Sequence, residues 1–148
     1  MNADDYRRKV KKTEIEINNC KDSIRRIEGE IDDASDAEAG VSRAMEGFLD
    51  YIANIKRSND ELRSASFTRI IGGVTNSVLG LTSGMKYLAA KVEFERGLDI
   101  IRNKKRNLEG ELQTANTRLR RLKREKENYQ QKYEEKLREE HGGGGRSF

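Results

Sequence analysis

The sequence contains no proline and no tryptophan, one cysteine, one histidine and only 6% aromatic residues among its 148. The single Cys20 excludes an intramolecular disulfide and any zinc site built from several cysteines, and the single His141 excludes paired-histidine metal sites. Charged residues make up 38% of the chain and hydrophobic residues 34%. A compact enzyme domain has about half apolar and about a quarter charged residues, so the composition argues for long helices or disorder instead.

The first half carries an apolar seam of residues spaced alternately three and four apart. Its members are Tyr6, Val10, Thr13, Ile17, Cys20, Ile24, Ile27, Ile31, Ala34, Glu38, Val41, Met45, Phe48, Ile52, Ile55, Asn59 and Leu62. This spacing predicts a long helix over about 5–69 whose seam packs against another helix. The polar members Thr13, Glu38 and Asn59 are typical of positions that set register in a coiled coil.

A second seam with the same spacing runs through the other half. It consists of Phe94, Leu98, Ile101, Lys105, Leu108, Leu112, Ala115, Leu119, Leu122, Lys126, Tyr129 and Tyr133. It predicts a second helix over about 76–140, and the glycines that follow His141 predict a flexible tail over 142–148.

The segment between the two seams differs in chemistry, because Ile70 to Met85 contains no charge and is rich in glycine. The adjacent Gly72 and Gly73 predict a turn at about 70–75. The predicted fold is therefore all-α, a long antiparallel helical hairpin that forms a single domain over 1–141. The tip of the hairpin is predicted to contain Gly72, Gly73, Gly80, Leu81 and Gly84.

Charge supports the antiparallel pairing. Residues 22–50 carry nine acids and three bases, whereas residues 102–126 carry ten bases and three acids. A fold about Gly73 places residue i opposite about residue 146 − i, so residue 20 should face 126 and residue 38 should face 108. We expect the acidic and basic blocks to meet and to favour this register.

The sequence shows no set of residues that points to catalysis, a metal or a cofactor. Gly72 and Gly73 do not belong to a Walker or dinucleotide-binding motif, so we expect a non-enzymatic protein that needs no cofactor. The first twelve residues are polar, which predicts cytosolic synthesis without a cleavable signal peptide; secretion would require another export route.

Two further functions stay open. The first is a membrane-active hairpin that inserts its uncharged tip, in which Gly80 and Gly84 form a small-xxx-small pair, although the uncharged run is shorter than the roughly 20 residues needed to span a bilayer. The second is a nucleic-acid-binding coiled coil that uses the basic run 118–126. We expect the acidic block to neutralise that run and consider this the weaker alternative.

The two apolar arms and the central Ile71-Gly72-Gly73 resemble the small α-helical proteins of bacterial type VII secretion loci. The layout is similar to the YwqH-like accessory proteins of LXG toxins and, more distantly, to the WXG-type hairpins. This resemblance implies a chaperone-like accessory protein that binds the helical N-terminal domain of a secreted toxin and supports its export.

A two-helix hairpin buries only one interface and leaves flanking apolar residues such as Leu49, Tyr51, Leu88 and Val92 partly uncovered. We therefore expect it to bind another helical protein or a second copy of itself. The seam residues expected to stabilise the partner are Ile17, Ile24, Ile31, Phe48, Ile52, Leu98, Leu108, Leu112 and Leu119.

Overall fold

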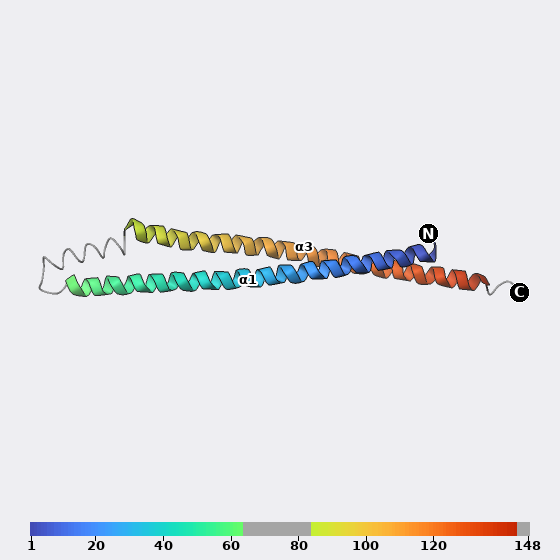
Figure 1. Ribbon diagram of the computed structural model, residues 1–148, viewed down its shortest axis with the longest axis horizontal. Helices are drawn as coiled ribbons and strands as arrows, with labels where there is room; N and C mark the ends of the chain where they lie inside the picture. The colour runs from blue at the N-terminus through green and yellow to red at the C-terminus, as the bar shows by residue number, and fades with distance from the viewer. Residues whose placement is uncertain (64–83, 145–148) are drawn as a thin grey trace. The chain divides into compact units, whose positions relative to one another are not determined.

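The computed structural model describes residues 1–63 and 84–144, with side chains described for 1–58 and 84–142. It contains helix α1, Ala3–Arg63, and helix α3, Met85–Gly144. The two helices pack against each other with opposite chain directions, so the predicted all-α helical hairpin is confirmed (Figure 1). The predicted turn, with Gly72, Gly73, Gly80 and Leu81, lies outside the described residues, as do residues 145–148 of the predicted tail.

Helix α1 begins with a reciprocal cap. The Asn2 side-chain oxygen accepts a hydrogen bond from the Asp5 backbone N–H at 3.0 Å, and the Asp5 carboxylate accepts one from the Asn2 backbone N–H at 3.1 Å. The acidic side chains of Asp4 and Asp5 also lie in the first turn, where the helix dipole favours negative charge. At the start of α3, the Gly84 carbonyl accepts a hydrogen bond from the Leu88 N–H at 3.2 Å.

Packing divides the chain into two compact units, which we describe separately. Unit 1 comprises Met1–Ile31 and Asn107–Phe148. Its core is a cluster of Ile17, Cys20, Ile24 and Leu122, against which Leu112, Ala115 and Leu119 pack. Leu122 is the most completely buried large side chain, at 2% exposure. This core consists entirely of predicted seam positions.

Polar members of the unit 1 seam satisfy their polar groups locally. The buried Thr13 hydroxyl donates a hydrogen bond to the Lys9 carbonyl at 2.7 Å. The Lys126 ammonium pairs with Glu14 at 3.3 Å, and the Lys9 ammonium lies 5.1 Å from the centroid of the Tyr129 ring. These contacts let polar side chains occupy seam positions without leaving a buried group unpaired.

Unit 2 comprises Asp32–Arg106. Its buried apolar side chains are Ala34, Ile52 and Leu98. Beside them Phe48 lies between Tyr87 and Phe94, with ring centroids 6.0 Å and 5.6 Å away. The half-buried Glu38 pairs with Arg102 at 3.7 Å. Among the described residues of unit 2, aromatic rings therefore add to the packing that the buried aliphatic side chains Ile52 and Leu98 provide.

The predicted register is wrong by six residues at two contacts between the helices and by eleven at a third. The Cys20 thiol contacts the Ala115 carbonyl instead of residue 126, and Glu38 pairs with Arg102 instead of residue 108. Glu14, predicted to face residue 132, pairs with Lys126. A slide of seven residues returns each seam to itself, so the periodicity leaves the register undetermined and the prediction relied on the assumed turn position alone.

Neither described helix contains a segment long and apolar enough to cross a membrane.

Candidate interaction surfaces

The predicted partner-binding seam is already used inside the chain. Of the predicted seam residues, Ile17, Ile24, Ile52, Leu98 and Leu108 are buried. The other four are half-buried: Ile31, Phe48, Leu112 and Leu119. Residues outside the seam must therefore provide any surface on which a partner binds. Of the predicted tip residues, Gly84 alone lies in the described part of the chain, directly before α3.

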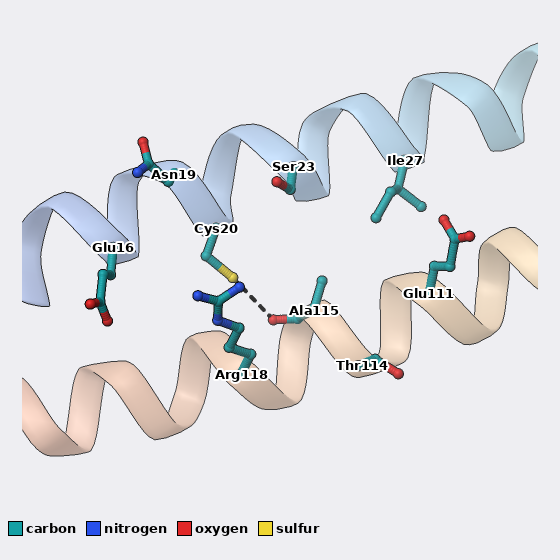
Figure 2. A pocket seen from close by; sticks show the side chains of 9 residues that line it. All are labelled: Glu16, Asn19, Cys20, Ser23, Ile27, Glu111, Thr114, Ala115 and Arg118. Atoms are coloured by element: carbon teal, nitrogen blue, oxygen red, sulfur yellow. Dashed lines mark hydrogen bonds between the residues drawn. The ribbon is translucent and has the colours of Figure 1, made fainter.

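A groove opens beside Cys20 in unit 1 (Figure 2). The thiol donates a hydrogen bond to the Ala115 carbonyl across the helix interface at 3.3 Å. The small side chains of Ser23 and Ala115 leave the space open, and Arg118 extends from α3 toward α1 beside the thiol. The remaining lining residues are Glu16, Asn19, Ile27, Glu111 and Thr114.

The chemistry of this groove is limited by how its polar groups are used. The Thr114 hydroxyl donates to the Gly110 carbonyl at 3.1 Å, and the Cys20 thiol is buried and already hydrogen-bonded. No group of three or more metal-ligating side chains occurs in the described residues. The groove is therefore a gap of mixed polar and apolar lining along the interface of the two helices and offers no recognisable acid, base or nucleophile arrangement.

Unit 2 exposes large apolar side chains on one flank of α3. Met85, Leu88 and Val92 are all exposed, Leu88 at 53%. Their spacing of three and four places them on one face of the helix. Leu49 of α1, half-buried, belongs to the adjoining flank. We call Leu49, Met85, Leu88 and Val92 the Leu88 face. Its exposure follows from position, since these residues lie beside the seam instead of in it.

A second apolar surface lies in the same unit. It is a groove lined by Gly40, Val41, Ala44, Ala90, Glu93, Phe94 and Gly97. Tyr51, exposed at 63%, lies two residues from Leu49, and therefore on the other side of the α1 seam. The sequence predicts the uncovered flanking residues Leu49, Tyr51, Leu88 and Val92, and their exposure confirms this, but the periodicity missed the groove because it finds the residues that pack inside the hairpin. Apolar residues next to the seam positions were the available signal.

The observed register also changes the electrostatics of unit 1. It places most of the basic run 118–126 beside residues of about 12–20, which include Glu14 and Glu16, and only Arg118, at the start of the run, lies near the acidic block 22–50, beside Ser23 and Ile27. Residues 7–26 and 112–132 together carry fifteen bases and five acids. We call these two segments the basic band. The expectation that the acidic block covers the basic run is therefore wrong.

Ion pairs confirm how little the two charge blocks meet. Among the described residues, only Glu14–Lys126 and Glu38–Arg102 join the two arms, and the other ion pairs lie within one helix. One such local pair, Lys136 with Glu139 at 3.1 Å, raises the pKa of the lysine through the hydrogen bond to the carboxylate. The positive charge of the basic band is thus largely left to face solvent or a partner.

Comparison with known proteins adds no relative, since no family model, curated protein or solved structure matches this chain.

Proposed function

We propose that this chain is a non-catalytic helical interaction protein, an accessory partner that binds the helical N-terminal domain of a type VII secreted toxin and supports its export. The observation that carries the binding role is the Leu88 face, an apolar surface outside the hairpin seam. Exposed apolar surface of this kind costs free energy in water and favours association. The toxin as partner rests on the resemblance of the helical hairpin to the accessory proteins of LXG toxins.

The binding mode follows from the shape of this surface. An amphipathic partner helix can lay its apolar face against Leu88 and Val92 and contact Leu49 at the edge. Because the seam side chains stay inside the hairpin, such a partner adds to the preformed pair of helices without opening it. The product is a bundle of three or more helices in which the Leu88 face becomes buried.

Co-purification tests this proposal. The full chain is co-expressed with the helical N-terminal domain of an LXG toxin, and we expect the two to elute as one complex. Replacing two apolar side chains, Leu88→Gln with Val92→Gln, should weaken the complex by about tenfold or more, since each of them is worth about 1 kcal/mol of binding free energy. The matched control is Ile15→Gln, an exposed apolar residue of unit 1. Equal weakening by the control would contradict the assignment.

Membrane binding is the alternative to toxin binding, and liposome flotation with the same double variant tests it. If the wild-type chain floats with liposomes in high salt and Leu88→Gln with Val92→Gln abolishes flotation, the Leu88 face binds lipid and the proposed partner is wrong. Most of the predicted tip lies outside the described residues. Met85, the last residue of the uncharged run that begins at Ile70, is described and is exposed.

A second candidate function is supported by the basic band. Its net positive charge is not covered by the acidic block, and Lys and Arg side chains can bind a nucleic-acid backbone without sequence readout. We expect duplex DNA or RNA to bind with an affinity that falls steeply with salt. Arg120→Gln with Lys123→Gln should lower the slope of that dependence by about 1 for each cation that binds a phosphate. Arg43→Gln with Arg106→Gln, in unit 2, is the matched control and should leave the slope unchanged.

A further inference from the structure

The groove of unit 2 is apolar along its length and is flanked by two exposed large side chains. Tyr51 and Ile100 are exposed at 63% and 61%. Glu93 is the one charged lining residue, and its carboxylate pairs with Arg96 of the same helix at 3.0 Å. The charge is therefore balanced locally, and the rest of the groove presents apolar surface.

Two glycines keep the groove open although the chain's own packing does not require them. A Cβ at Gly40 or Gly97 would meet no atom within 4 Å. Glycine inside a helix lowers its stability relative to alanine, so these positions weaken α1 and α3 without relieving any contact within the chain. The open space they leave is suited to the close approach of another backbone.

Both helices present a regular row along this groove. On α1 the row consists of Asp33, Ala37, Gly40, Ala44, Gly47 and Tyr51. On α3 it consists of Lys86, Ala90, Glu93, Gly97, Ile100 and Lys104. Each row has alternating spacings of four and three, which places its members on one face of the helix. All of these residues are exposed or half-buried.

We propose that a second copy of this chain docks into this groove about a two-fold axis parallel to the helices. Each copy then lays α1 over α3 of the other. The Phe48 ring lies against both Tyr87 and Phe94, and Gly40 and Gly97 line the same groove, so these contacts fix which residues of α1 and α3 lie level with each other. Rotation about this axis preserves those levels. The two rows therefore meet residue against residue, and every contact occurs twice.

The two rows are complementary in charge and size. At one end Asp33 faces Lys104 of the second copy. In the middle Ala37 faces Ile100 and Gly40 faces Gly97, so a large side chain meets a small one and two glycines allow close approach. At the other end Tyr51 faces Lys86, a ring beside an ammonium. A closed symmetric dimer requires a surface that is complementary to itself. The two rows along the groove meet this requirement, and the dimer that they form is a four-helix bundle.

The molecular mass of the full chain in solution tests the proposal. Sedimentation from micromolar to hundreds of micromolar concentration should show a species of twice the 17.0 kDa chain mass. Gly97→Gln should be monomeric over the same range and at least as helical, because a Cβ at this position meets none of the chain's neighbouring atoms and the longer side chain extends into the groove where the second copy would dock. Gly110→Gln is the matched control; its Cβ position in unit 1 is equally open, and we expect it to remain dimeric.

Disulfide capture tests the orientation. One chain carries Asp33→Cys and a differently tagged chain carries Lys104→Cys, both with Cys20→Ala. We expect a mixed disulfide between the two tags on oxidation, whereas Asp33→Cys alone should stay reduced. Because each chain has one cysteine, no bond within a chain can form. Charge reversal at Asp33→Lys should raise the dimer Kd about fivefold, and adding Lys104→Asp should restore it.

Three results would overturn the proposal: a wild-type chain that stays at 17.0 kDa throughout, a Gly97→Gln chain that remains dimeric, or mixed tags that do not cross-link. If Leu88→Gln dissociates the dimer and Gly97→Gln does not, the second copy docks on the Leu88 face instead and the groove assignment is wrong. Binding of the toxin domain is measured separately on the Leu88 face, so either proposal can fail without the other.

Discussion

Unit 1 and unit 2 follow the same seam spacing but use it differently. In unit 1 the seam forms a continuous buried cluster around Leu122, and the surrounding surface is charged. Among the described residues of unit 2, three apolar side chains are buried, whereas Tyr51, Met85, Leu88, Val92 and Ile100 are exposed. Both units hold α1 and α3 together; the comparison indicates that the core of unit 1 is more closed and that unit 2 offers more apolar surface for association.

The largest expected effect comes from placing a charge in each core. Ile24 and Ile52 are equally buried, at 8% exposure, in unit 1 and unit 2 respectively. Ile24→Asp should lower the free energy of unfolding by about 3–5 kcal/mol, because an unpaired carboxylate enters a closed cluster. Ile52→Asp should cost less, about 2 kcal/mol, since its seam neighbours are half-buried and the carboxylate can reach water.

Urea unfolding followed by far-UV circular dichroism measures both changes. Ile15→Asp is the control, because Ile15 is exposed at 61%, and it should shift the unfolding free energy by no more than about 0.5 kcal/mol. Equal losses for Ile24→Asp and Ile52→Asp would show that the two cores are equally closed, and the division of roles between the units would be wrong.

The seam residues are the feature of this molecule that the sequence predicts best. From Tyr6 to Ile55 and from Phe94 to Tyr133, each predicted seam residue is buried or half-buried. The period of a helix alone determines which residues turn toward a partner, so this result needs no long-range information. The register cannot be found from the helix period, because the position of α1 along α3, seen in the contact of Cys20 with Ala115, depends on the connection between the arms and on core packing.

The interaction surfaces could be predicted from the sequence only in part. Leu49, Tyr51, Leu88 and Val92 are apolar and lie beside the seams, which was enough to predict that they stay partly uncovered. Gly40 and Gly97 are far apart in the chain, and only the antiparallel pairing brings them to one groove. Without a register, the groove could not be assembled from the sequence.

Replacing glycine by alanine should give the next largest change in the free energy of unfolding, and its effect on association should differ between the two units. A Cβ at Gly29, Gly110, Gly40 or Gly47 would meet nothing within 4 Å. Gly29→Ala with Gly110→Ala in unit 1 should raise the free energy of unfolding by about 1–2 kcal/mol, because each alanine restores up to about 1 kcal/mol of helix propensity. Gly40→Ala with Gly47→Ala should stabilise the monomer equally.

The two glycine pairs should differ in association. A methyl group at Gly40 narrows the groove of unit 2, and one at Gly47 lies in the same row of α1, whereas those in unit 1 lie away from the groove. We expect sedimentation to show weaker association for the unit 2 pair alone, although both pairs unfold at higher urea concentration. Destabilisation of the monomer by either pair would mean that these glycines serve the chain's own packing, which the open space around them argues against.

The smallest expected effect concerns the two ion pairs between the arms. A double-mutant cycle of Glu14→Gln with Lys126→Gln in unit 1, and another of Glu38→Gln with Arg102→Gln in unit 2, should each give a coupling of about 0.2–1 kcal/mol that falls with added salt. The distances are 3.3 Å and 3.7 Å, and each pair keeps partly exposed side chains, so solvent screens both. Couplings this small would mean that the register depends on seam packing, with Leu122 and Phe48 holding the arms in place. A coupling of several kcal/mol at Glu38–Arg102 would instead assign the register of unit 2 to charge.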